Sequence, residues 1–159
     1  MDEATFATLL RGESRKLYCV AYSILWNDAD CADAMQEAAA KAWLRMGQLK
    51  REEFASTWLC RILINECITL RRRRRVPTVP LDEAAGIASK DEVPDIDLKR
   101  ALARLPEKYR LPLILHHQDG YSLREIAEML SLTEKRVRSR LHQARKALRE
   151  LLGGEDHEA

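Results

Sequence analysis

Glycine and proline are scarce in this sequence, whose 159 residues include only 6 of the first and 5 of the second. This scarcity argues against a β-sandwich, because the many turns of that fold need both residue types. Aromatic residues are also few, at 6%, whereas hydrophobic residues make up 46% and charged residues 33%. That balance is typical of a folded, charge-rich chain, and no alternation of strand type lasts long enough to matter. We therefore predict an all-α fold.

Long apolar runs are absent as well. The longest uncharged stretches, such as residues 17–27, are much shorter than the roughly 20 apolar residues that a membrane-spanning helix needs. The chain begins with Met1, and the acidic Asp2 and Glu3 follow where a secretory signal peptide is positively charged. From these two observations we expect a soluble protein located in the cytoplasm.

No cysteine or histidine pattern indicates a metal site or a redox site. The four cysteines stand at positions 19, 31, 60 and 67 without a Cys-x-x-Cys motif. Cys60 and Cys67 would lie about 10 Å apart along a helix, too far for a disulfide. Neighbours on a helix point about 100° apart, and neither His116 nor His117 has a third ligand at i+4. We expect reduced core thiols, no metal and no cofactor. Without a nucleophile–base pair or a phosphate-binding glycine loop, the sequence does not support an enzyme either.

The net charge of +2 hides a strongly uneven distribution. Residues 41–75 carry 10 basic and 3 acidic side chains, and residues 131–150 carry 7 and 2. Between these blocks, residues 76–99 carry 2 basic and 6 acidic side chains. Two separate basic blocks are typical of a protein that contacts a polyanion at two places. Two solvated helix faces would give the same pattern, and charge alone does not distinguish the two interpretations.

Residues 1–75 are expected to form a first helical domain. Apolar residues at three-and-four spacing predict one helix around Leu17–Leu25 and a second through Met35–Met46, which includes Trp43. Asp28 or Asp30 would cap the second helix and Gly47 would end it. A third helix, starting near Phe54, is apolar nearly all round and should be the buried centre of the domain. It leaves the core as five consecutive arginines at 71–75.

The rest of the chain divides into a linker, a second domain and a tail. Residues 76–95 contain three prolines and several acidic residues but little apolar surface, which predicts a flexible linker. Residues 96–152 should form a second helical domain, which begins with two short helices around Leu98–Leu105 and Tyr109–Leu115. Residues 153–159 form an acidic tail.

A helix-turn-helix is predicted at residues 122–149. Ser122 and Glu125 have the spacing of a capping box at the start of the first helix, and Thr133 is placed to cap the second. In the second helix Val137, Leu141, Ala144 and Leu148 share one apolar face. Cationic and hydrogen-bonding side chains cover the opposite side and its flanks, a mixture that suits the major groove of DNA. They are Lys135, Arg136, Arg138, Ser139, His142 and Gln143, with Arg145 expected at a phosphate. The alternative is a solvated basic helix.

Several motifs in one order resemble the extracytoplasmic function (ECF) sigma factors, the smallest bacterial transcription initiation factors. The resemblance covers about residues 5–152. The motifs that carry it read DAMQE at 33–37, TWLCRI at 57–62, LPEKYR at 105–110 and GYS at 120–122. It implies that residues 1–75 are sigma region 2 and residues 96–152 are sigma region 4. Such a protein binds core RNA polymerase and directs it to promoters, and it has no catalytic residue of its own.

The resemblance also implies roles for individual residues. Region 4 would read the minus-35 element as duplex, while region 2 would read and melt the minus-10 element. The beta flap of core polymerase is a further implied contact. Asp33, Gln36 and Glu37 would dock on the beta-prime clamp helices. Leu49 and Asn65 would line a pocket for a flipped minus-10 base, although Asn65 could instead be a capping or core amide. The DNA backbone would be held by Arg61, Arg71, Arg72, Arg73, Arg74 and Arg75. An anti-sigma factor is a further implied partner.

Two other readings of the sequence stay open at this point. A helix-turn-helix regulator that binds DNA without recruiting polymerase explains residues 96–152 equally well, but it leaves the motifs of the first domain unexplained. The other class is an enzyme or a purely structural helical protein, and for catalysis the sequence offers no nucleophile–base pair, phosphate-binding glycine loop or metal spacing. At the turn, Ser131 stands where the family often has glycine, so this residue either strains the turn or adopts the left-handed conformation.

Overall fold

The computed structural model describes residues 1–74 and 96–157, and every regular element in these ranges is helical. The first range contains α1 (Glu3–Leu25), α2 (Asp28–Leu44), two short 3-10 turns (Met46–Gln48 and Glu52–Phe54) and α3 (Ala55–Arg74). The second contains α5 (Ile96–Arg104), α6 (Glu107–Leu113), a π-helix (Ile114–Gln118), α7 (Leu123–Leu130) and α8 (Glu134–His157). The all-α prediction is therefore confirmed. The predicted linker, Arg75 and residues 158–159 lie outside the described residues.

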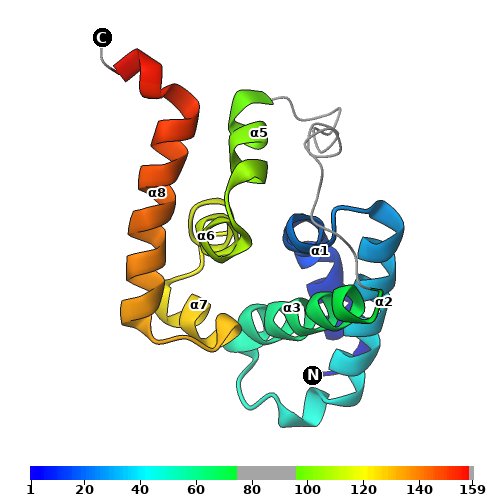
Figure 1. Ribbon diagram of the computed structural model, residues 1–159. Coiled ribbons are helices and arrows are strands. Elements are labelled where there is room, and N and C mark those ends of the chain that lie inside the picture. The colour runs from blue at the N-terminus through cyan, green and yellow to red at the C-terminus, as the bar shows by residue number, and fades with distance from the viewer. Residues whose placement is uncertain (75–95, 158–159) are drawn as a thin grey trace.

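The front half, residues 1–74, is a bundle in which α1, α2 and α3 all contact one another (Figure 1). Val20 and Ala21 of α1 and Leu63 of α3 are fully buried, so α3 is the central helix that its sequence predicted. Trp43 departs from the prediction: its side chain is 42% exposed and its ring packs on Phe6 at the bundle surface.

The predicted ends of α2 were wrong in detail. Asn27, not Asp28 or Asp30, is the N-cap, and its Oδ1 accepts a hydrogen bond from the backbone N–H of Asp30 at 2.8 Å. Asn27 has the extended backbone of a capping residue, whereas both aspartates already lie in the first turn, where they favour the positive end of the helix dipole. The helix ends at Leu44, before Gly47, because the chain there tightens into a 3-10 turn.

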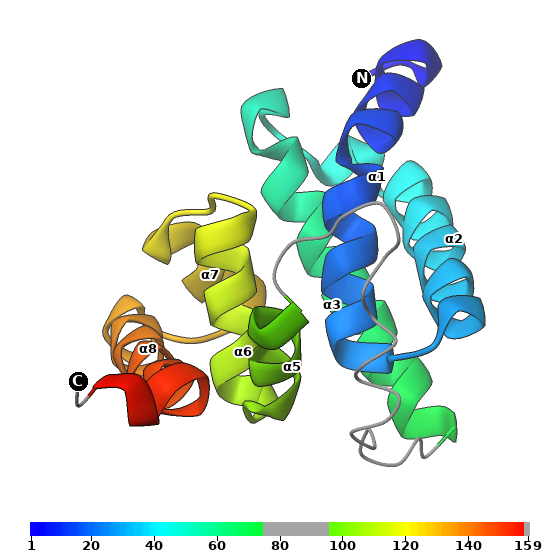
Figure 2. The same ribbon diagram turned by 90° about the horizontal axis from the view of Figure 1, so that it is seen from above.

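The rear half, residues 96–157, is organised around α8, which packs against α5, α6 and α7. Pro112 lies inside α6 and removes one backbone donor, and the π-helix follows directly. The five π-helical residues lead to Asp119 and to Gly120, which has the positive φ of 77° that glycine accepts readily. Figures 1 and 2 show α8 on the side of the rear half that faces away from α1, α2 and α3.

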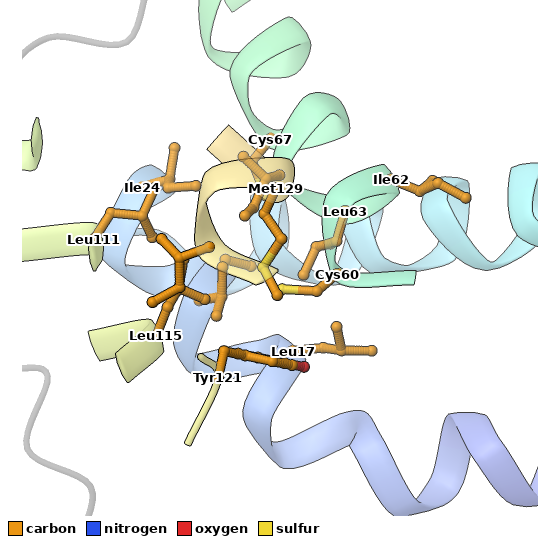
Figure 3. Packing of buried hydrophobic residues seen from close by; sticks show 14 of the residues in the cluster. Leu17, Ile24, Cys60, Ile62, Leu63, Cys67, Leu111, Leu115, Tyr121 and Met129 are labelled. Carbon is orange, nitrogen blue, oxygen red and sulfur yellow. The ribbon is translucent and has the colours of Figure 1, made fainter. Parts of the chain in front are cut away.

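The two halves pack directly on each other, with α7 against α3 and α6 against α1 (Figures 1 and 2). Figure 3 shows the apolar side chains that meet there. The front half contributes Leu17, Ile24, Cys60, Leu63 and Cys67, and the rear half contributes Leu111, Leu115, Tyr121 and Met129. All of them are at most 5% exposed, so the halves share one hydrophobic cluster.

Polar contacts surround this shared cluster. The hydroxyls of Ser56 and Tyr121 are 2.7 Å apart, and the Thr57 hydroxyl donates to Glu125 Oε2 at 3.1 Å. The buried Arg110 of α6 donates from Nη2 to the carbonyl of Ser23 at 3.0 Å, and its guanidinium lies over the Trp26 ring at 5.0 Å. Trp26 ends α1 with a φ of 56°, an uncommon conformation for a non-glycine residue.

Candidate DNA and polymerase interfaces

Local hydrogen bonds set the shape of the helix-turn-helix. Ser122 Oγ accepts from the backbone N–H of Glu125 at 3.1 Å, and Glu125 Oε1 accepts from the backbone N–H of Ser122 at 2.8 Å. This is the predicted capping box. Thr133 Oγ1 accepts from the backbone N–H of Arg136 at 3.1 Å and caps α8. Ser131 adopts the left-handed conformation, with a φ of 58° and a ψ of 46°, which decides between the two possibilities open for the turn.

The two faces of α8 divide as the sequence predicted. Val137, Leu141 and Ala144 are at most 2% exposed and anchor the helix on α6 and α7. The polar residues assigned to DNA all lie on the exposed surface: Lys135, Arg136, Arg138, Ser139, His142, Gln143 and Arg145. The helix lies on the side of the rear half away from α1, α2 and α3, and these side chains are open to solvent (Figure 1).

The structure adds neighbours to this face that sequence reasoning missed. A shallow groove between α6 and α8 is lined by Lys108, Tyr109, Arg136, Arg140, Ser139 and Gln143. It carries three cations and no carboxylate. On the other flank, Arg145 Nε donates to His117 Nε2 at 3.4 Å. Partial burial, His116 and Arg145 lower the pKa of His117, which favours the neutral ring that can accept this bond. The only signal for these neighbours was the LPEKYR motif, which gives no information on packing.

On α2, Asp33, Gln36 and Glu37 form an exposed polar stripe, as their spacing predicted. The same residues line a groove between α2 and the end of α3, together with Glu66, Arg73 and Arg74. Lys41 and Glu66 form an ion pair inside this groove. The stripe is therefore accessible to a partner, and its carboxylates suit a basic one.

The arginine run at the end of α3 is not uniformly available. Arg71 forms a double hydrogen bond with Glu107 of α6, and its Nη2 lies 3.1 Å from Glu107 Oε2. Arg74 pairs with Asp30 and, at 3.3 Å, with Asp33. Arg72 and Arg73 are exposed. Two of the four described arginines are thus paired with carboxylates and are not free on the surface, a difference that the run of five arginines in the sequence did not reveal.

The remaining candidates for minus-10 DNA lie on or near α3. Arg61 and Asn65 are exposed and one helical turn apart, so they share a face. Asn65 lies in the interior of α3, which excludes the capping and core-amide alternatives. Leu49 is half-buried in the connection between α2 and α3, and Leu44 at the end of α2 and Phe54 just before α3 are 81% and 49% exposed. This connection therefore presents apolar surface that the sequence analysis did not anticipate.

The four cysteines are reduced thiols that lie in or beside the core. None of the four cysteines forms a disulfide, and burial raises the pKa values of Cys31 and Cys60, so these two thiols are protonated and unreactive at neutral pH. Within the ranges 1–74 and 96–157, no cluster of three or more metal-ligating side chains occurs. In the same ranges, no helix has the length and apolarity to cross a membrane.

Comparison with known proteins identifies the family of each half of the chain. Residues 9–76 match the family of sigma-70 region 2, and residues 95–148 match the family of sigma-70 region 4. The chain is 34% identical over 155 residues to the ECF RNA polymerase sigma factor SigM of Mycobacterium tuberculosis, covering 96% of this chain and 79% of that protein. It is 31% identical over 170 residues to SigW of Bacillus subtilis, covering 95% and 90%.

Solved structures agree with this class. The sigma factor RpoE of Bartonella quintana, solved with the anti-sigma factor NepR, superposes with a TM-score of 0.78 at 25% identity, covering 95% of this chain and 98% of that one. CnrH, solved with the cytosolic domain of CnrY, has the same fold, with a TM-score of 0.74 at 24% identity and coverage of 98% and 92%. The chain belongs to the ECF RNA polymerase sigma factors. It is a transcription initiation factor that binds RNA polymerase and directs it to promoters.

Proposed function

We propose that the two halves divide the work of promoter recognition. Residues 1–75 dock on polymerase and read and melt the minus-10 element, and residues 96–152 read the minus-35 element. The observation that carries this proposal is the exposed polar face of α8, opposite the buried stripe of Val137 and Leu141. A helix that is anchored on one side and cationic on the other fits the major groove, where arginine and lysine recognise guanine.

The front half supplies the second contact with DNA and the first with polymerase. Asp33, Gln36 and Glu37 bind the beta-prime clamp helices, and the beta flap binds the rear half. Leu49 and Asn65 receive a flipped minus-10 base, while Arg61 and the arginine run hold the backbone. The exposed position of Asn65 on α3 and the apolar surface of the α2–α3 connection support this assignment.

RNA polymerase carries out the chemistry of transcription. This chain selects the promoter and melts the minus-10 DNA, and it contributes no catalytic residue. Because its partner is RNA polymerase, we assign it to the bacterial cytoplasm. An anti-sigma factor is a further proposed partner, since RpoE of Bartonella quintana was solved with one.

Run-off transcription tests the proposal directly. Purified chain and core polymerase together should start transcripts from DNA upstream of the chain's own gene, and neither should do so alone. Capture of core polymerase on the immobilised chain should accompany this activity. Specific DNA binding without polymerase capture would instead identify a helix-turn-helix regulator.

A further inference from the structure

Arg71 and Glu107 join the two halves of the molecule. Arg71 lies in the last turn of α3, and Glu107 is the first residue of α6. Both guanidinium Nη atoms donate to the two carboxylate oxygens of Glu107, which is the bidentate geometry that arginine also adopts with phosphate. The two side chains are 32% and 30% exposed, so the pair sits at the rim of the interface and solvent reaches it.

One guanidinium cannot hold Glu107 and a DNA phosphate in the same bidentate geometry. A carboxylate and a phosphodiester both present two oxygens to a fork of donors, so Glu107 at the fork of Nη1 and Nη2 excludes a phosphate from that fork. The hydrogen bonds that Arg71 donates to Glu107 also raise the pKa of Arg71 above its ordinary value, because the carboxylate stabilises the charged guanidinium. While the halves are packed together, Arg71 is therefore withheld from DNA.

The packed arrangement is also too small to read both promoter elements at once. Elements named minus-10 and minus-35 lie about 25 base pairs apart, or about 85 Å at 3.4 Å per base pair. A compact chain of 159 residues has a radius of gyration of about 15 Å. Reading both elements requires the halves to separate, and separation breaks the pair between Arg71 and Glu107.

We propose that Glu107 is an internal competitor of the DNA backbone for Arg71. In the packed form the carboxylate of the rear half occupies a phosphate-binding guanidinium of the front half. DNA binding at Arg71 then favours separation of the halves, and separation favours DNA binding by the same factor. This inference rests on the proposed role of the arginine run as a contact for the DNA backbone.

Fluorescence anisotropy with a labelled duplex of arbitrary sequence at low salt tests the competition on the full chain. Glu107→Gln removes the competitor's charge and keeps its shape, so the dissociation constant should fall by roughly threefold. Glu128→Gln is the matched control, because Glu128 is an exposed carboxylate of the same half and removes the same charge from the chain. This control should leave the dissociation constant nearly unchanged.

The Arg71→Ala background separates competition from a general charge effect. In this background Glu107→Gln should give no gain in affinity, because the guanidinium that it releases is missing. An equal gain in both backgrounds, or an equal gain for Glu107→Gln and Glu128→Gln, would overturn the proposal. Circular dichroism of each variant checks that the helices remain folded.

Two further measurements distinguish this inference from the proposed function. Arg72→Ala reports the phosphate role alone, because Arg72 lies in the same turn without the Glu107 contact. Weaker binding by Arg72→Ala with no effect of Glu107→Gln would reject the competitor and keep the backbone contact. If Arg71→Ala and Arg72→Ala both leave DNA affinity unchanged, the arginine run is not a backbone contact and both proposals fail. Small-angle X-ray scattering of Glu107→Gln should show a radius of gyration at least as large as that of wild type, because the shared cluster still holds the halves together, and a smaller radius would contradict the link to separation.

Discussion

The two basic clusters of this sigma factor have similar composition but different surroundings. At the end of α3, Arg71 and Arg74 contact carboxylates that other helices supply. On α8, by contrast, Lys135, Arg136 and Arg138 are exposed, and none of them pairs with a carboxylate among residues 1–74 and 96–157. The carboxylates of neighbouring helices therefore partly neutralise the cluster on α3, whereas the cations on α8 are available to bind an anion. A count of positive charges along the sequence predicts candidate DNA contacts, but it does not show whether those side chains are already paired within the fold.

The largest expected effect comes from removing the α3 cluster. Replacing all five arginines at 71–75 with alanine should weaken binding to every DNA sequence alike. The slope of log K against log salt should become shallower by up to about 0.9 for each phosphate that the variant no longer neutralises. Titrations at several salt concentrations measure this slope, and the matched run of five lysines should largely retain it. A slope that the alanine run leaves unchanged would mean that the cluster is only a solvated helix end.

The second prediction concerns the junction between the halves. Asp119 is 9% exposed, its Oδ2 has no hydrogen-bond partner, and burial raises its pKa from 3.8 to about 6. Lys16 and Glu13 of α1 act on it from the front half, the lysine lowering and the glutamate raising its pKa. Because the folded pKa lies above the unfolded one, the protonated carboxyl is favoured in the fold. The contribution of Asp119 to the stability of the fold is therefore fully present below pH 3.8, and it is lost as the pH rises through about 6.

The substitution Asp119→Asn tests whether the ionised carboxylate destabilises the fold. At pH 7.5 the variant should be more stable than wild type by up to about 3 kcal/mol, and the difference should shrink on acidification. Urea unfolding at pH 7.5 and at pH 5 measures both values. Glu128→Asn, at an exposed position of α7, is a control that should show no such pH dependence. A destabilised Asp119→Asn at pH 7.5 would show that the ionised carboxylate is required by the turn.

The third prediction sharpens the contrast within α8. Arg138→Ala should cost roughly 1–3 kcal/mol at the minus-35 element, and the loss should be confined to one or two base pairs. Arg145→Ala should instead weaken all sequences by a similar factor, because Arg145 lies on the flank beside His117. A panel of single-base promoter variants separates these outcomes. An equal loss on every variant for Arg138→Ala would make it a phosphate contact and move base reading to Lys135 and Ser139.

The smallest effect on stability is expected on α2. Reversing the charge at Asp33 and Glu37 should weaken capture of core polymerase by roughly tenfold. The free energy of unfolding should change by no more than about 0.5 kcal/mol, because both side chains are exposed and the pair with Arg74 is at the surface. Charge reversal at Glu3, exposed on α1, serves as the control. Loss of helicity by circular dichroism would show that the two carboxylates are structural.

The sequence predicted the features that depend on near neighbours in the chain. The capping box at Ser122, the Thr133 cap and the faces of α8 each need residues three or four positions apart, so periodicity and capping rules identify them. Burial of α3 was also predictable, because its residues are apolar nearly all round. The N-cap of α2 was missed because Asn27 competed with two nearby aspartates that satisfy the same rule.

The features that the sequence did not predict join residues far apart in the chain. The pair between Arg71 and Glu107 spans 36 positions, and the pair between Arg74 and Asp30 spans 44. Neither follows from helical periodicity, which says which face a residue occupies but not which helix that face meets. The same limit applies to the packing of Leu115 and Met129 against the front half, where each stripe looked like the core of its own domain.

The position of Arg110 has a consequence for how the free chain unfolds. A helix leaves its last carbonyls without internal partners, and at the end of α1 the carbonyl of Ser23 receives its hydrogen bond from this rear-half guanidinium. The last turn of the first helix is thus completed by a residue 87 positions later in the chain. Together with the shared cluster, this bond couples the two halves into one cooperative unit. Calorimetry of the free protein should therefore show a single transition whose calorimetric and van't Hoff enthalpies agree, although the sequence carries two domains.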